Sequence, residues 1–315
     1  MRAVSVTGDA IVVTSLLWQT TATALRAGEE GMLIDSPYFP DELELLPAVL
    51  GQAGFEPNAL LATHADFDHL LGRLAFPELS LGVAESTMRR LQAKPGEAQR
   101  ELRGHDAEHY VSRPRPLALG GTQSLPVPGK LGLGGEELEL HPAEGHVGDG
   151  MAVFAPWLGV LVAGDYLSSV EIPMLGPGGS VAEYRGTLAR LAPLVERAET
   201  VVAGHGPPSS RETAQRLLDE DSAYLDLLER GEERPPLPEG RDNAHQRKIH
   251  ADNLAALDGG GSPVRSRPMA EEECPVCKSR VPPTDAEQAE CANCDAKLTR
   301  GDDRAWVLAG DAPAG

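Results

Sequence analysis

One polar turn directly behind an apolar run constrains this chain more than any other feature. Residues 60–72 read LLATHADFDHLLG. Four side chains that can bind a metal fall within six residues of this stretch: His64, Asp66, Asp68 and His69. The apolar residues 59–62 predict a short buried strand, and the run that starts at residue 70 predicts the opening of a helix. The cluster therefore lies at the carboxyl end of a strand, where α/β folds place their chemistry.

Each of the four residues, taken alone, would usually be a solvated or hydrogen-bonded side chain. The set is different, because buried charged groups without a partner are costly and all four directly follow a buried strand. A cation is a partner that they can share. A tight turn aims neighbouring ligands at adjacent points, so this cluster can supply ligands to two metal ions.

Three more polar residues follow predicted strands further along the chain. His146, in the segment EGHVGDG, comes after the alternating strand predicted at 137–141. Asp165 follows the apolar run VLVAG, and His205 follows the run TVVAG. Every candidate ligand thus sits where a strand ends, and the glycine at position 145 lets the backbone pass close to a metal ion.

These motifs, in this order, resemble those of the metallo-β-lactamase-fold hydrolases. Residues 64–69, HADFDH, are similar to that family's His-x-His-x-Asp-His signature, with Asp66 where the second histidine usually stands. The resemblance covers about residues 1–230, and four ordered motifs make it more specific than the first motif alone. It implies an α/β fold, a four-layered αββα sandwich in which two mixed sheets face each other and helices lie outside.

The resemblance also implies a binuclear metal site with a catalytic role for Asp68, which would hold one ion and orient or take the proton of a hydroxide. Seven side chains would hold the ions: His64, Asp66 and His146 the first, Asp68, His69 and His205 the second, with Asp165 as the bridge. Zinc is the expected divalent ion at both positions. The carboxylate of Asp66 is a harder donor than imidazole, which makes iron or manganese the alternatives.

The function that the resemblance implies is hydrolysis. A metal-bridging hydroxide would attack a small ester, thioester or lactone, as in the glyoxalase-II-like branch of the family. One alternative is a non-haem iron oxidoreductase of the same fold, either flavodiiron-like or persulfide-dioxygenase-like. Another is a non-catalytic scaffold whose C-terminal tail is an interaction module. The sequence does not identify the substrate.

All four cysteines of the chain lie in its tail, in two Cys-x-x-Cys pairs. They are Cys274, Cys277, Cys291 and Cys294, with thirteen residues between the pairs. Four thiolates complete a tetrahedral zinc shell, and such a closed site is structural. Because a module of this size has little apolar mass, metal binding would supply its folding free energy. We expect a zinc-ribbon-like module that serves protein contact or self-association, with redox-active or idle thiols as the alternative.

The resemblance, the cysteine pattern and the change in composition after residue 257 together imply four regions. They are a metallo-β-lactamase-fold domain at 1–230, a helical extension at 231–257, a flexible linker at 258–273 that opens with DGGGSP, and the zinc-ribbon-like module at 274–309.

Local patterns predict the elements around the candidate site. Residues 1–36 predict an antiparallel meander, and Asp41 and Ser86 are expected to cap two helices. The loop 171–179 predicts either part of a pocket rim, with Ile172, Met174 or Leu175 near the substrate, or ordinary loop packing. Four histidines are expected on exposed faces rather than as ligands: His105, His109, His245 and His250.

Charge and cysteine usage narrow the expected partners and compartment. The formal net charge of −20 argues against a nucleic-acid partner, because phosphate binding needs a basic surface. The first 270 residues have no cysteine, which fits a reducing cytosol. No apolar run is long enough to span a bilayer, and the stretch 11–18 lacks the flanks of a signal peptide. We therefore expect a cytoplasmic protein that acts on a small molecule and binds no membrane.

Overall fold

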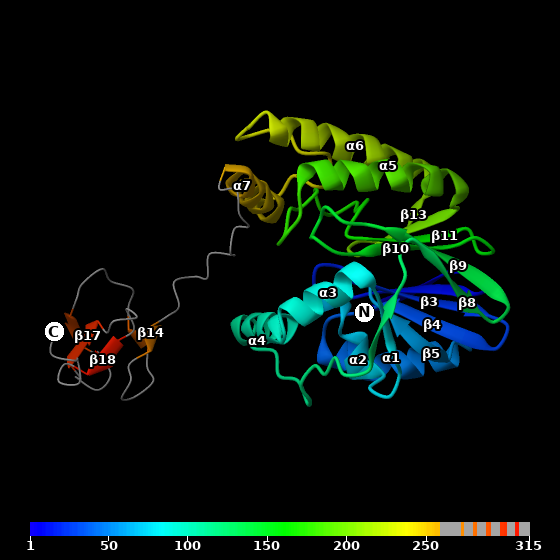
Figure 1. Ribbon diagram of the computed structural model, residues 1–315, viewed down its shortest axis with the longest axis horizontal. Helices are drawn as coiled ribbons and strands as arrows, with labels where there is room; N and C mark the ends of the chain where they lie inside the picture. Colours follow the sequence, from blue (N-terminus) through cyan, green and yellow to red (C-terminus); the bar gives the residue numbers. More distant parts are fainter. Residues whose placement is uncertain (259–271, 274–279, 282–287, 291–296, 301–305, 309–315) are drawn as a thin grey trace. The chain divides into compact units, whose positions relative to one another are not determined.

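The computed structural model describes residues 1–258 and five short strands beyond them (Figure 1). The chain divides into two compact units, Met1–Ser262 and Pro263–Gly315. Most of the expected linker and all four cysteines lie outside the described residues. The linker and the structural zinc site therefore stay predictions.

The first sheet of the larger unit holds seven strands in chain order. Its first four strands form the expected antiparallel meander, and its last three join in parallel. The strands are β1 (Arg2–Thr7), β2 (Ala10–Thr14), β3 (Thr21–Ala27), β4 (Glu30–Asp35), β5 (Pro57–Leu61), β6 (Leu81–Ala84) and β7 (Thr122–Leu125). The change of direction after β4 follows from the helix inserted there, because parallel neighbours need a crossover connection.

The second sheet has six strands in the order β13-β12-β11-β10-β9-β8. All of its pairs are antiparallel except β11 with β12. Its strands are β8 (Gly129–Leu133), β9 (Glu136–Pro142), β10 (Met151–Ala155), β11 (Val160–Gly164), β12 (Thr200–Ala203) and β13 (Ser209–Ser210). Both sheets are therefore mixed, as expected.

Helices lie on the outer face of each sheet (Figure 1). Those beside the first sheet are α1 (Pro40–Gln52), α2 (Gly72–Ala75), α3 (Glu85–Ala93) and α4 (Glu97–Glu108), with the short 3₁₀ helix η1 (Phe67–His69) before α2. Those beside the second sheet are α5 (Val181–Arg197), α6 (Arg211–Glu229) and α7 (Ala244–Asp258). The sequence predicted α6 with these same bounds.

The buried apolar residues separate into three clusters that correspond to the layers. Adjacent residues of β5 show why: Leu60 packs in the cluster with α1, whereas Leu61 packs in the cluster between the sheets. Side chains alternate across a strand, so a strand that is apolar throughout is buried on both faces. A third cluster joins the second sheet to α5 and α6. The expected α/β architecture of two mixed sheets with helices outside is confirmed.

Two of the expected helix caps are wrong. The helix α1 begins at Pro40, one residue before Asp41, and the side chain of Glu42 accepts a hydrogen bond from Phe39 N at 3.1 Å. The helix α3 begins at Glu85, and Ser86 lies inside it. Ser86 Oγ instead accepts a hydrogen bond from Gly150 N at 3.3 Å, across 64 residues of sequence. A local hydrogen bond of Glu42 thus stands at the start of α1, and a tertiary contact occupies Ser86.

Two of the four histidines expected on exposed faces are buried. His105 is 7% exposed, and its Nδ1 lies 2.6 Å from Tyr38 Oη. His250 is also buried, and its Nδ1 lies 3.0 Å from Tyr224 Oη. Each histidine lies on the inner face of an outer helix, where a tyrosine of a neighbouring element meets it. His109 and His245 are exposed as expected.

The smaller unit is described only through its strands. There β14 (Glu272–Glu273) pairs with β15 (Arg280–Val281), and β16 (Gln288–Glu290), β17 (Lys297–Arg300) and β18 (Trp306–Leu308) form an antiparallel sheet. Among the described residues of the whole chain, no helix combines the length and apolar character that crossing a membrane requires.

Candidate metal centre

The seven candidate ligands come together at one edge of the two sheets. Each stands just past the end of a strand or in the turn that follows: His64, Asp66, Asp68 and His69 after β5, His146 after β9, Asp165 after β11 and His205 after β12. Because β11 and β12 are parallel neighbours, Asp165 and His205 meet at the same edge. The structure therefore brings all seven candidates from the sequence together at this edge.

The first group of donor atoms surrounds Asp66. Its Oδ2 lies 3.6 Å from both His64 Nε2 and His146 Nε2. In the second group, Asp68 Oδ2 lies 3.8 Å from His69 Nε2 and 3.5 Å from His205 Nε2. The donor atoms of each group lie within 4.8 Å of one another. Two ligands of one tetrahedral zinc ion are roughly 3.3 Å apart, so both groups have a suitable size.

Asp165 lies between the two groups. Its Oδ2 is 3.2 Å from His146 Nε2, 3.7 Å from His64 Nε2 and 3.4 Å from His205 Nε2. Its Oδ1 is 3.2 Å from His69 Nε2. One carboxylate thus reaches imidazoles of both groups, which is the geometry of a bridging ligand.

Several of these buried donor atoms have no hydrogen-bond partner among the described residues. They are the Nε2 atoms of His64, His69 and His146, and Asp165 Oδ1. A buried polar group without a partner costs free energy, so native structures rarely leave four of them in one place. The donor set is therefore suited to bind metal ions.

The other nitrogen of His146 and of His205 has a hydrogen-bond partner that sets the direction of the ring, and that of His69 faces a carboxylate. His146 Nδ1 donates to Met174 O at 3.0 Å, and His205 Nδ1 donates to Trp18 O at 3.1 Å. His69 Nδ1 lies 3.0 Å from Asp35 Oδ2. A proton on Nδ1 leaves the lone pair of Nε2 facing the centre, which is the usual arrangement of metal-binding histidines.

The carboxylates hold protons on these imidazoles in the metal-free protein. Burial alone would lower the pKa of His146, but the carboxylates of Asp165 and Asp66 beside its Nε2 outweigh it and raise that pKa to about 10. Burial likewise opposes a charge on His205, but Glu171 and Asp165 raise its pKa to about 10. Protons therefore compete with metal ions for these two ligands.

Arg90, on α3, holds the unusual carboxylate in place. Its guanidinium lies 2.8 Å from Asp66 Oδ1 and 2.9 Å from Asp149 Oδ1, and Asp149 Oδ2 accepts a hydrogen bond from Ala65 N. Asp66 therefore gives one oxygen to Arg90 and turns the other to the imidazoles. Burial would raise the pKa of Asp66, but His146, His64 and Arg90 keep it well below its usual value. No signal in the sequence distinguished Arg90 from its neighbour Arg89.

Two glycines allow close approaches near the site. A Cβ on Gly204 would lie 2.0 Å from Asp165 Oδ1 and 2.8 Å from His69 Cε1, so only glycine fits beside these ligands. A Cβ on Gly145 would lie 2.2 Å from Tyr184 N, and its φ is +124°. The close approach that Gly145 permits is thus to the start of α5.

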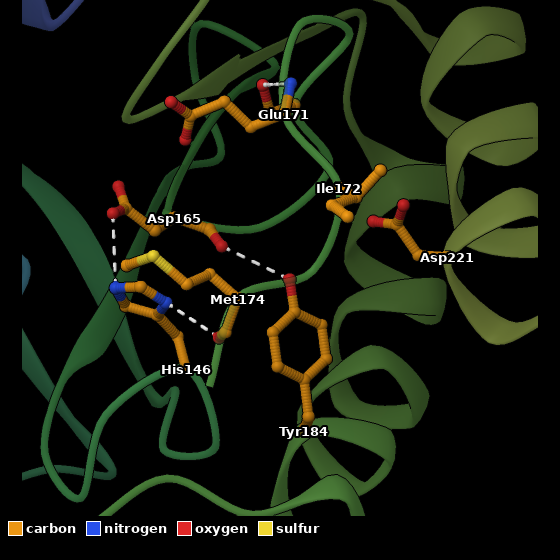
Figure 2. Close-up of a pocket in the computed structure, with 8 residues that line it drawn as sticks. His146, Asp165, Glu171, Ile172, Met174, Tyr184 and Asp221 are labelled. Atoms are coloured by element: carbon orange, nitrogen blue, oxygen red, sulfur yellow. Dashed lines mark hydrogen bonds and ion pairs between the residues drawn. The ribbon is translucent and has the colours of Figure 1, made fainter. Parts of the chain in front are cut away.

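A small cavity with room for about one water molecule adjoins the centre (Figure 2). It is lined by His146, Asp165, Ser168, Glu171, Ile172, Met174, Tyr184 and Asp221. Figure 2 shows His146 between Asp165 and the backbone of Met174. Ile172 and Leu175 are also buried in the outer core, so this loop both packs against the core and lines the cavity. Glu171 was not a sequence candidate, and burial raises the pKa of its carboxyl group.

Comparison with known families agrees with the resemblance stated above. A family model described as the metallo-beta-lactamase superfamily matches residues 16–205, which is more than half of the chain. The chain belongs to this superfamily. No curated protein matches the chain.

Solved structures of the superfamily share its fold. A metallo-beta-lactamase family protein from Thermus thermophilus is 21% identical, with a TM-score of 0.58, over 81% of this chain and 93% of that one. The sec-alkylsulfatase Pisa1 from Pseudomonas sp. is 14% identical, with a TM-score of 0.61, over 81% of this chain and 49% of that one. A protein named TTHA1623, solved in a di-iron-bound form, is 24% identical, with a TM-score of 0.50, over 65% of this chain and 97% of that one. At these identities the similarity extends to the fold alone.

Proposed function

We propose that this member of the superfamily is a hydrolase with two metal ions in its active site. One observation carries the proposal: buried donor atoms without hydrogen-bond partners among the described residues converge on Asp165 where β5, β11 and β12 end. These atoms lie within ion-pair distance of carboxylates but lack a hydrogen bond of good geometry, and metal ions would bind them directly.

The ligands of each ion follow from the two groups. We assign His64, Asp66 and His146 to the first ion, Asp68, His69 and His205 to the second, and Asp165 to both. Each ion would then have two imidazoles, one carboxylate of its own and a share of Asp165. Two ions held by these two groups would activate a water molecule as a nucleophile and polarise the substrate's carbonyl oxygen.

We propose separate roles for the residues around the two ions. Asp165 fixes the distance between the two groups, because its two oxygens contact imidazoles of both. We propose that Asp68, whose Oδ2 lies near His69 and His205, orients the attacking water and accepts its proton. Ile172 and Met174 line the cavity beside His146 and limit the access of bulk water.

The proposed substrate class is a small ester, thioester or lactone. The resemblance to the glyoxalase-II-like branch supports it, together with the acidic composition, which disfavours nucleic acid. For the tail, we propose a structural zinc bound by Cys274, Cys277, Cys291 and Cys294 that folds a module for protein contact or self-association. The proposed location is the cytoplasm.

Zinc is the proposed metal, and iron chemistry is the second candidate. Two observations favour iron: Asp66 supplies an oxygen where the family signature has a nitrogen, and TTHA1623 is described in a di-iron-bound form. A flavodiiron-like oxidoreductase would use the same ligands but needs an electron donor, and the sequence has no flavodoxin-like glycine-rich phosphate loop to supply one. Hydrolysis needs none, and we therefore place it first.

One experiment separates these candidates. The full chain, purified without added metal, is subjected to elemental analysis and screened against ester, thioester, lactone and phosphodiester probes. We expect three zinc ions per chain, two in the metal centre and one at the tail cysteines, and turnover of at least one carbonyl probe. Predominant iron with a visible absorption band and no hydrolysis would favour the oxidoreductase.

Variants of the site complete the test. Replacing His64 with Ala should abolish turnover and reduce the metal content, while His109→Ala, which removes an exposed histidine outside the site, should leave both unchanged. Full activity in His64→Ala would refute the proposed function.

A further inference from the structure

The chain between β11 and α5 runs from residue 165 to residue 180 without a strand or a helix. Buried backbone groups in such a segment still need hydrogen-bond partners, and irregular segments of this length in compact domains are usually functional. This site loop, residues 165–180, starts at the bridging candidate Asp165 and lines the cavity beside His146. What holds its backbone therefore decides the shape of the site.

Two side chains of α7 bind the middle of the site loop. Asn253 Oδ1 accepts a hydrogen bond from Leu175 N at 2.8 Å, and Asn253 Nδ2 donates to Pro173 O at 2.7 Å. Gln246 Oε1 accepts from Ile172 N at 2.8 Å. Gln246 is 2% exposed and Asn253 is 0% exposed, so water does not compete for these bonds.

A third side chain binds the beginning of the site loop. Arg241, just before α7, donates to Ser168 O at 3.3 Å and to Glu171 O at 3.0 Å. The same guanidinium is paired with Asp221 at 2.5 Å and with Glu220 at 2.8 Å, both on α6. Arg241 is 1% exposed. A buried guanidinium with so many partners is fixed, and it fixes the carbonyl groups that it binds.

The loop passes this constraint on to a ligand of the first group. The two bonds of Asn253 lie on either side of Met174, whose carbonyl oxygen accepts the hydrogen bond from His146 Nδ1 (Figure 2). Gly176 N in addition donates to His146 O at 2.7 Å. Asn253 therefore fixes the residue that sets the direction of the His146 ring.

We propose that the extension, residues 231–257, is part of the metal centre, and that Asn253 is a positioning residue that holds His146 toward the first ion. This inference rests on the proposed function. The extension lies wholly beyond residues 16–205, which match the superfamily. It acts on the first group, because the contact of Met174 is with His146, whereas His205 is oriented by Trp18 O from the other sheet.

The test is the zinc affinity of the purified full chain, measured by competition with a chelator below the melting temperature of each variant. Asn253→Leu keeps the approximate volume and removes both bonds to the loop. We expect one of the two zinc ions to bind about tenfold or more weakly and the other to bind as in the wild type. The cobalt-substituted variant should show an altered visible spectrum.

Two control variants separate positioning from general stability. Tyr224→Phe removes the hydroxyl that Asn253 Nδ2 also contacts at 2.9 Å, but leaves the loop bonds in place. Arg247→Met, on the same helix as Asn253, removes the exposed pair with Asp242 and a bond to Pro235 O but no bond to the site loop. Both should bind two zinc ions with wild-type affinity, even where the melting temperature falls. Asn253→Asp, which keeps the acceptor for Leu175 N, should lose less affinity than Asn253→Leu.

The possible outcomes separate a failure of the inference about Asn253 from a failure of the proposed function. A wild-type chain that binds no metal at the metal centre refutes the proposed function. A wild-type chain that binds two ions there, together with an Asn253→Leu variant of equal affinity for both, refutes the inference alone. Should Asn253→Leu not fold, Gln246→Met decides by the same measurement, because it removes one bond two residues before Met174.

Discussion

The two ligand groups of the metal centre are held by different parts of the molecule. In the second group, His69 faces Asp35 at the end of β4, and His205 is oriented by Trp18 O, directly after β2. Both supports belong to the antiparallel meander. In the first group, Asp66 is held by Arg90 on α3 and His146 by the site loop. These supports come from an outer helix and, through the loop, from the extension.

The difference shows which of the two metal positions is held by the sheet itself. The meander strands are neighbours in sequence and in the sheet, so the supports of the second group form together with the sheet. The supports of the first group lie outside that sheet: they need a salt bridge from α3 and the buried amide contacts by which α7 holds the site loop. The first position is therefore the one that a substitution far from the site can change.

The largest effect is expected at Asp165, because both ligand groups share its carboxylate. Asp165→Ala deletes the carboxylate that both groups share, so both ions should be lost and kcat/KM should fall by roughly 10⁴-fold or more. Elemental analysis and steady-state kinetics measure it. His141→Ala, which removes a half-buried histidine bonded to Glu139, is the control and should stay active. Two bound ions in Asp165→Ala would show that the groups are independent.

The next effect should fall on the first group. Arg90→Met leaves Asp66 and Asp149 without their shared counter-charge, and breaking such a buried pair costs about 3 kcal/mol. Urea denaturation of the metal-free chain measures the free energy of unfolding. Its exposed neighbour provides the matched variant, Arg89→Met, which should unfold like the wild type. If the two substitutions lowered the free energy of unfolding equally, Arg90 would have no special role in holding Asp66.

Metal binding should release protons from both groups. His146 and His205 have pKa values near 10 in the metal-free protein, so each should carry a proton at pH 8 and lose it to an ion. Calorimetry in buffers of different ionisation enthalpy measures the release, which we expect to be roughly one proton for each of these histidines. A binding enthalpy independent of the buffer would contradict the raised values.

The same shifts predict how the stability of the metal-free protein depends on pH. Both folded pKa values lie above the unfolded value of about 6.5. The stabilisation from these charged imidazoles is therefore complete below about pH 6.5 and is lost as the pH rises toward 10. Thermal unfolding across this range should show the decline without metal. Zinc-loaded protein serves as the comparison and should show a weaker dependence.

The smallest expected effect is a change in the pKa of His205 that leaves the pKa of His146 nearly unchanged. Glu171 is the strongest of the charges that raise the pKa of His205, whereas Asp165 and Asp66 dominate at His146. Glu171→Gln should lower the pKa of His205 by about one unit and leave His146 nearly unchanged. Proton NMR titration of the metal-free chain measures both. Equal shifts would mean that the groups are not electrostatically distinct.

Much of the fold and the ligand set could be predicted because the relevant signals are local. The apolar run before His64 predicted β5, and the helical periodicity of residues 211–229 predicted α6. The ligands follow strand ends in a recognisable order, so their convergence could be expected from the resemblance. The tail signal is equally local, but its cysteines lie outside the described residues and its zinc site stays a prediction.

Only the tertiary structure identified the partners of these ligands. Trp18 O and His205 Nδ1 are 187 residues apart in sequence, and Arg90 resembles any exposed helix residue until α3 packs beside the turn. For the same reason Ser86 is not a cap and His250 is not on the surface. The sequence by itself determined the strands, the helices and the donor atoms, because these follow from the periodicity and chemistry of adjacent residues. Which polar group meets which was decided by packing, since a hydrogen bond forms only where the fold brings two distant segments within about 3 Å.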